Sequence, residues 1–73
     1  MSGFTVVVAG MIQGTFSVVV EAVYVPDALG PAEAGRLATA RFEAATDIAV
    51  IPADIYTGRR CGGALIPATV YDP

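Results

Sequence analysis

The sequence contains no histidine, lysine, asparagine or tryptophan, and Cys61 is its single cysteine. Without histidine, the commonest general base is missing, and one thiol is too few for a structural zinc site. An internal disulfide is excluded for the same reason. Ser2 and Ser17 are the only serines, and neither has an evident base beside it. We therefore predict a protein that is not an enzyme and that holds no cofactor and no metal.

Basic charge is also scarce, because four arginines face seven acidic residues and the net charge is −3. A nucleic-acid binder needs a basic surface to meet phosphates, so nucleic acid is an unexpected partner. A lone cysteine fits a reducing compartment, and we expect a cytoplasmic or virion-associated protein. The abundance of alanine, valine and glycine is typical of a GC-rich coding genome, such as that of an actinobacterium or one of its phages.

The chain has 73 residues, which is enough for one domain, residues 1–73. A domain of this size buries only about 60% of the surface that its unfolded chain exposes, so its core is marginal. Disulfides and metals are excluded above, and association with further copies is the remaining way to bury more apolar surface. We therefore expect a homo-oligomer.

Two internal repeats outline the architecture. The segment Ala49–Tyr56 recurs fifteen residues later as Ala64–Tyr71, with five of eight positions identical. A weaker echo relates Phe4–Val8 to Phe16–Val20. Segments with the same alternation are typical of neighbouring strands that share one shape.

The pattern along the chain predicts an α+β fold of ββ-α-ββ order, in which two β-hairpins flank one helix. Valine-rich runs predict strands, glycines predict the first turn, and Gly30-Pro31 opens the helix. Each of the last two strands contains a proline, Pro52 or Pro67, which predicts an edge position or a bulge there. The expected elements are strands 4–9 and 15–25 around a turn at 10–14, a helix from 31 to about 46, a strand over 47–51 that continues at 55–57, a loop over 57–63 and a strand over 64–71.

The alternation of side chains predicts which residues need a partner. We expect Phe4, Val6 and Val8 to share one face with the even-numbered residues of the second strand. The helix, with a stripe of mostly alanine, covers only one face of a sheet that is apolar on both. The other face then leaves an interaction surface that consists of Val7, Val19, Val23 and Val25.

The second repeat predicts two tyrosines with matching environments. If Ile55 and Val70 point into the core, Tyr56 and Tyr71 project together on the outer side. Tyrosine is enriched at protein interfaces, so both residues join the expected interaction surface. The alternative is that these rings pack over the sheet edge within one subunit.

The loop with Arg59 and Arg60 is the segment with the most binding-like chemistry. Two arginines among glycines can present a charged fork and backbone amides to an anion, although no P-loop context surrounds them. The alternative is a hairpin loop whose arginines keep an acidic protein soluble. Cys61 is expected to be an apolar filler rather than a reactive thiol. Glu43 and Asp47 supply at most half of a cation site, and a solvated helix end is the simpler interpretation.

The sequence favours a non-enzymatic structural or protein–protein interaction module that acts as a homo-oligomer, with a phage accessory or virion protein for capsid coating or assembly as a specific form of it. Two alternatives stay open. One is an anion or nucleic-acid binding module that uses Arg59 and Arg60. The other is a small membrane-associated protein anchored by residues 4–25, a stretch whose only charge is Glu21.

Overall fold

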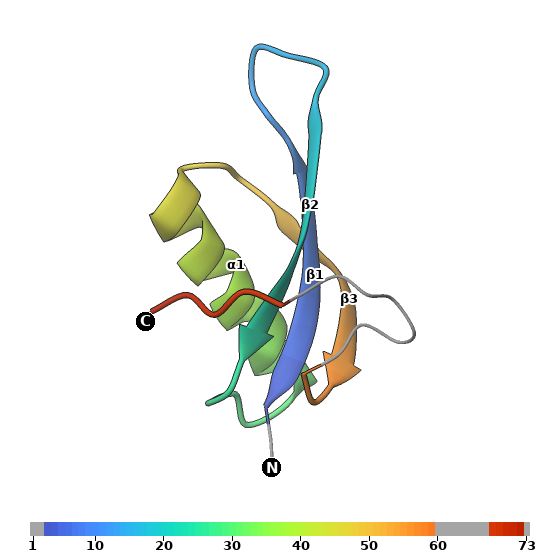
Figure 1. Ribbon diagram of the computed structural model, residues 1–73, viewed down its shortest axis with the longest axis vertical. Helices are drawn as coiled ribbons and strands as arrows, with labels where there is room; N and C mark the ends of the chain where they lie inside the picture. Colours follow the sequence, from blue (N-terminus) through green and yellow to red (C-terminus); the bar gives the residue numbers. More distant parts are fainter. Residues whose placement is uncertain (1–2, 60–67, 73) are drawn as a thin grey trace.

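A central valine-rich strand is paired on both sides in the computed structural model, which describes residues 3–59 and 68–72. The elements are β1 (Phe4–Met11), β2 (Val18–Val25), α1 (Pro31–Thr46) and β3 (Ile51–Thr57). The strands form an antiparallel sheet of order β2-β1-β3, and α1 packs on one of its faces (Figure 1). The α+β fold predicted from the sequence is confirmed.

The pairing of β1 with β2 decides which side chains lie beneath the helix. Val6 pairs with Val23 and Phe4 with Val25, so these residues share the helix-covered face. The expected interaction residues Val23 and Val25 are therefore fully buried, and Val19 packs half-buried against the same core. The prediction that these three valines lie on the uncovered face was wrong, and Val7 alone of the four lies there, half-buried opposite Ala22.

The error has a simple origin in the length of the turn. The strands are joined by six residues, 12–17, in place of the expected five at 10–14. The expected turn would place Ala9 opposite Thr15, whereas Ala9 pairs with Val20. A register shift by an odd number of residues moves every side chain of one strand to the opposite face. The β1 and β2 side chains that point to the uncovered face include those of Val7, Met11, Val18, Val20, Ala22 and Tyr24.

The helix presents small residues to the sheet. Its buried positions are Ala34, Gly35, Ala38 and Phe42, whereas Ala45 in the last turn is exposed. At Gly35 a Cβ atom would stand 3.4 Å from both Ile55 and Pro52, so α1 lies close to β3. Phe42 supplies most of the bulk between helix and sheet, and together with the buried valines it forms the core.

Both ends of α1 are held by short-range hydrogen bonds. Leu29 N–H donates to the Glu33 side chain (2.7 Å), which satisfies one amide before the first turn. Asp47 ends the helix in the left-handed conformation (φ 63°), and its N–H donates to the Glu43 carbonyl (2.8 Å). Residues 47–50 consequently form a connection and not the strand expected at 47–51.

Pro52 interrupts the sheet as predicted. The register of β1 with β3 shifts between Val7 and Val8, where Val8 faces Pro52. Proline cannot donate to the ladder, which explains why the irregularity falls there on an edge strand.

The end of the chain returns to the opposite edge of the sheet. Thr69 forms an isolated parallel bridge with Val23 of β2, and no bridge to β3 occurs within the described residues. Most of the expected last strand, 64–71, and most of the loop at 57–63 lie outside the described residues. The described part of the repeat Ala64–Tyr71 therefore pairs with β2. It does not pair with β3, the strand that the matching repeat Ala49–Tyr56 contributes to.

The register predicts opposite responses at two valines of β2. Replacing Val23 with Thr places a hydroxyl in the core and should lower the free energy of unfolding by about 1–3 kcal/mol. The same change at exposed Val20 should stay within about 0.5 kcal/mol. Urea unfolding at low protein concentration measures both, and equal losses at the two positions would contradict this register.

Candidate interaction surface

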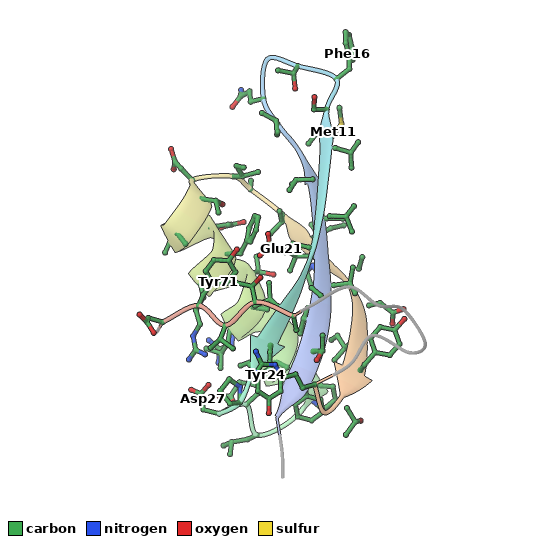
Figure 2. The ribbon with its side chains drawn as sticks, in the orientation of Figure 1. Met11, Phe16, Glu21, Tyr24, Asp27 and Tyr71 are labelled. Atoms are coloured by element: carbon green, nitrogen blue, oxygen red, sulfur yellow. The ribbon has the colours of Figure 1, made fainter. Side chains whose placement is uncertain are left out.

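The β1–β2 hairpin extends beyond the helix and ends in an ordered turn (Figure 2). Ile12 N–H donates to the Ser17 carbonyl (3.0 Å), and the Thr15 hydroxyl donates to the Ile12 carbonyl (3.0 Å). The Thr15 oxygen also accepts from Ser17 N–H (3.0 Å). Gly14 has φ 85° and provides the left-handed residue that the turn requires. These bonds give the projecting end a defined shape.

Large apolar side chains gather on this projecting end. Phe16 is 96% exposed, and Val18, Met11 and Val20 are 65%, 59% and 58% exposed. Together with Ile12 we name these residues the hairpin patch. No charged residue occurs between Phe4 and Val20, so the patch carries no charge of its own. Clustered exposed apolar residues on a small protein are typical of a protein–protein contact surface.

The other end of the same sheet face is closed. Thr5 is fully buried and its hydroxyl donates to the Gly58 carbonyl (2.6 Å). Ala22, which pairs with Val7 on the same face, is buried as well. Apolar exposure on the uncovered face is therefore concentrated at the hairpin end, and sequence reasoning missed Met11, Phe16, Val18 and Val20 as its components. The uncharged run over residues 4–20 was the signal that could have located them.

The two tyrosines of the repeat lie in different environments. Tyr56 shares the uncovered face with Thr5 and donates to the Asp54 carboxylate (2.8 Å). Tyr71 packs against the helix-side core, edge-to-face with Phe42 at 5.7 Å between ring centres. The prediction that both rings project on one side was wrong, because residues 68–72 lie beside β2 in space, whereas Tyr56 belongs to β3.

Tyr71 also ties the end of the chain to a charged residue of the sheet. Its hydroxyl donates to the carboxylate of Glu21, which points to the helix side of β2 (Figure 2). Burial raises the pKa of Tyr71 to about 12, and the hydrogen bond and charge of Glu21 act in the same direction. Glu21 is thereby provided with a donor despite its apolar surroundings.

Arg59 is already engaged within the molecule. Its guanidinium carbon lies 5.0 Å from the centre of the Tyr24 ring, and it donates to the Ala68 carbonyl (3.4 Å). A cation over an aromatic ring is a stabilising contact. Arg60 and Cys61 lie outside the described residues, so the expected pair of arginines cannot be placed as an anion site.

A second arginine forms an ion pair that sequence reasoning missed. Arg41 donates two hydrogen bonds to Asp27, at 2.9 and 2.8 Å, and so ties the helix to the end of β2. The residues are fourteen positions apart, and no local pattern indicates their contact. The hydrogen bonds from Arg41 lower the pKa of Asp27 to about 2. Glu33 and Arg36 form a further ion pair at 3.5 Å on the surface.

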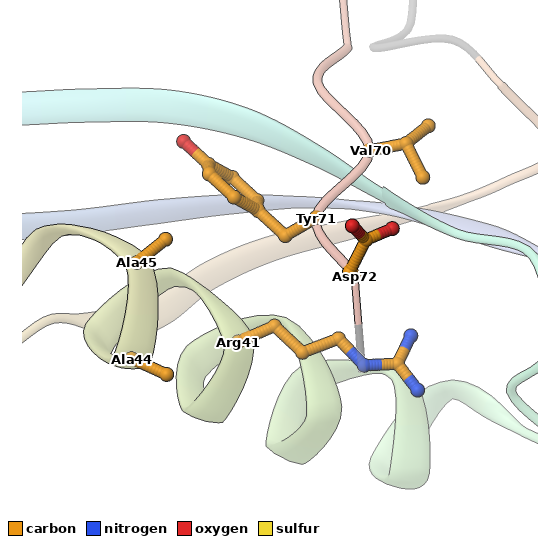
Figure 3. A pocket seen from close by; sticks show the side chains of 6 residues that line it. All are labelled: Arg41, Ala44, Ala45, Val70, Tyr71 and Asp72. Atoms are coloured by element: carbon orange, nitrogen blue, oxygen red, sulfur yellow. The ribbon is translucent and has the colours of Figure 1, made fainter.

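A shallow hollow lies between α1 and the end of the chain (Figure 3). Its volume is about 350 Å³, and Arg41, Tyr71 and Asp72 contribute its polar groups. Ala44, Ala45 and Arg41 form its helix side, and the Arg41 guanidinium is already bound to Asp27. A small-molecule site usually combines an enclosed apolar wall with several convergent polar groups, and this hollow has neither.

The acidic residues do not converge on a cation site. Glu43 accepts a hydrogen bond from Val50 N–H (3.1 Å) and thereby supports the connection into β3. Within residues 3–59 and 68–72 no three acidic or thiol side chains gather as ligands for a metal ion. The residues 4–25 form the β1–β2 hairpin and not a helix, and no helix in the described part of the chain is long and apolar enough to cross a membrane.

No protein-family model matches the chain, and no match was found among curated proteins or solved structures.

The Tyr71–Glu21 contact predicts a stability that depends on alkaline pH. A raised pKa means that the neutral phenol is favoured in the folded state, so this contribution is complete below pH 10.0 and is lost as the pH rises to about 12. Tyr71→Phe should remove that dependence and cost about 1–2 kcal/mol at neutral pH. Chemical unfolding at several pH values measures both effects. Tyr56→Phe, at an exposed hydroxyl, is the control and should cost less; the reverse order would contradict the assignment.

The Asp27–Arg41 pair predicts a dependence on acid pH. The lowered pKa stabilises the folded state above pH 3.8, and this stabilisation is lost as the pH falls to about 2. Asp27→Asn should therefore be less stable than the wild type at neutral pH and equal to it near the acid end. Thermal melts across this range provide the measurement. Asp72→Asn serves as the control, and a constant difference for Asp27→Asn at all pH values would show that the charge is not responsible.

Proposed function

We propose that the protein is a non-enzymatic structural or interaction module that associates with further copies of itself through the hairpin patch. The observation that carries this proposal is the uncharged projecting hairpin, on which Phe16 is 96% exposed. At about 25 cal/mol per Å² of apolar surface removed from water, covering several such side chains favours association.

The end of the hairpin is ordered but lies away from the core, as expected of a binding surface. The turn is ordered by its own hydrogen bonds, and the buried valines lie at the other end of the strands. Phe16 therefore adds nothing to the core, and its exposure has an energetic cost in water unless a partner covers it. An aromatic side chain on a pre-ordered turn is a typical anchor residue, since little entropy is lost when it binds.

The biological setting that we propose is a phage accessory or virion protein that coats or assembles a capsid. Two features of the sequence support this setting. The amino-acid composition is typical of a GC-rich genome, and the chain is small enough to benefit from association with further copies. A cytoplasmic or virion-associated location follows from the same proposal. Binding of anions through Arg59 and Arg60 is not favoured, because Arg59 already contacts Tyr24 and Ala68.

Two equally exposed side chains allow a matched test. Phe16 lies at the tip of the hairpin, whereas Leu29, 92% exposed, lies before α1 at the other end of the molecule. Phe16→Asp should weaken self-association by about 2 kcal/mol or more, the scale of an aromatic hot spot, while Leu29→Asp should leave it unchanged. Light scattering after size-exclusion chromatography and sedimentation measure the effect.

A wild-type protein that stays monomeric at high micromolar concentration would refute the proposal. Association that Leu29→Asp weakens as much as Phe16→Asp would show that the contact is nonspecific. Binding of the wild type to neutral lipid vesicles, with loss in Phe16→Asp and no self-association in solution, would assign the patch to a membrane surface instead.

A further inference from the structure

The backbone of β2 has an outward edge whose hydrogen-bonding residues can be identified. Ile12 N–H donates to the Ser17 carbonyl, so the odd-numbered residues that follow also bond to β1. Even-numbered residues turn their N–H and C=O groups outward. The bridge to Thr69 agrees, because Tyr24 N–H donates to the Thr69 carbonyl (2.8 Å) and Thr69 N–H donates to the Ala22 carbonyl (2.9 Å).

Thr69 covers only the part of this edge that lies near the core. Toward the hairpin tip, the next outward-facing residues are Val18 and Val20, and no described residue donates to or accepts from their outward groups. Both side chains are exposed, and the segment contains neither a charge nor a proline. Natural edge strands usually carry such features to prevent pairing. The opposite edge, β3, carries two of them, Pro52 and Asp54.

We propose that two copies join by antiparallel pairing of their Val18–Val20 segments, which extends each three-stranded sheet into the other. This inference rests on the proposed function and specifies its geometry. Val18 of one copy lies opposite Val20 of the second, and Val19 faces its own counterpart across a twofold axis. Each copy then donates two backbone N–H groups and accepts at two carbonyls, so all four outward groups of each edge are satisfied.

The register follows from the position of Thr69. Placing Val20 opposite its own counterpart would pair Val18 with Ala22, but the Ala22 carbonyl already accepts from Thr69. Centring the pair on Val19 avoids that conflict. A second copy is the matching occupant because the edge is short, uncharged and complementary to itself, as a twofold contact requires.

The hairpin patch supplies the remaining contact. Val18 and Val20 alternate across the new strand pair on the uncovered face, where apolar cross-strand neighbours stabilise a sheet. A stable interface needs about 1,000 Å² or more of buried surface, which two short edges alone do not supply. Phe16 and Met11 lie on the same hairpin near its tip and can add apolar contact area (Figure 2).

The first test removes the outward donor of Val18. Val18→Pro loses an N–H that β1 does not use, so the fold should persist, as circular dichroism and a thermal melt would verify. The dimer loses two backbone hydrogen bonds, and the dissociation constant should rise about tenfold or more. Val18→Thr retains both the β-branched shape and the N–H and should associate like the wild type.

A second test reports the register directly and does not depend on proline. Residues that face each other without mutual hydrogen bonds have Cα atoms about 4.5 Å apart, which lies within the range for a disulfide. In a Cys61→Ser background, Val19→Cys should therefore form disulfide-linked dimers under mild oxidation. Ala53→Cys, on exposed β3, is the control and should remain unlinked at the same concentration.

Amide hydrogen exchange of the wild type completes the design. Val19 should be protected at every concentration, because its N–H faces β1, whereas Val18 and Val20 should gain protection only as the protein associates. Association with unprotected Val18 and Val20 amides, no linked Val19→Cys dimer and an unaffected Val18→Pro variant would overturn the edge pairing while leaving the proposed function intact. Absence of any wild-type association would reject both.

Discussion

The pairing of Val6 with Val23 is the constraint on which the rest of the structure depends. This register, set by a six-residue turn, brings the valines of two strands beneath one helix and leaves the alternate valines uncovered. Phe42 and the small residues of α1 fit above that layer. The same alternation turns the outward backbone groups of β2 toward Thr69 at one end, whereas at the other end no described residue pairs with them. Core, exposed patch and open edge are therefore three results of one register.

Local rules recovered the parts of the fold that local interactions determine. Pro31 and Glu33 specify the start of α1 at the observed residue, and the interruption at Pro52 follows from its missing N–H. The face of each β2 valine could not be predicted in the same way, since one residue of turn length reverses it. The contact of Arg41 with Asp27 and the return of Thr69 to β2 depend on the final packing of distant segments.

The interaction surface shows the same division between composition and geometry. The small size of the chain and the prediction of a sheet that is apolar on both faces led to the expectation of self-association. The interaction surface was wrongly assigned to Val19, Val23 and Val25, whose side chains point to the helix-covered face of the sheet. Repeated sequence was an equally indirect guide, because Tyr56 and Tyr71 share a motif but contact different strands. Similar residues take different roles when the chain places them at opposite edges of a sheet.

The unequal edges of the sheet have a consequence for the size of any assembly. β3 carries Pro52 and Asp54, and Thr69 covers the inner half of β2, so within the described strands a short stretch of backbone is left to receive another strand. A molecule with two receptive edges can add copies without limit and grow into a fibre. One with a single, self-complementary edge uses that edge up at the first encounter. In the proposed assembly, the position of Thr69 would limit growth, so that sheet extension would end at a discrete particle and not continue into a fibre.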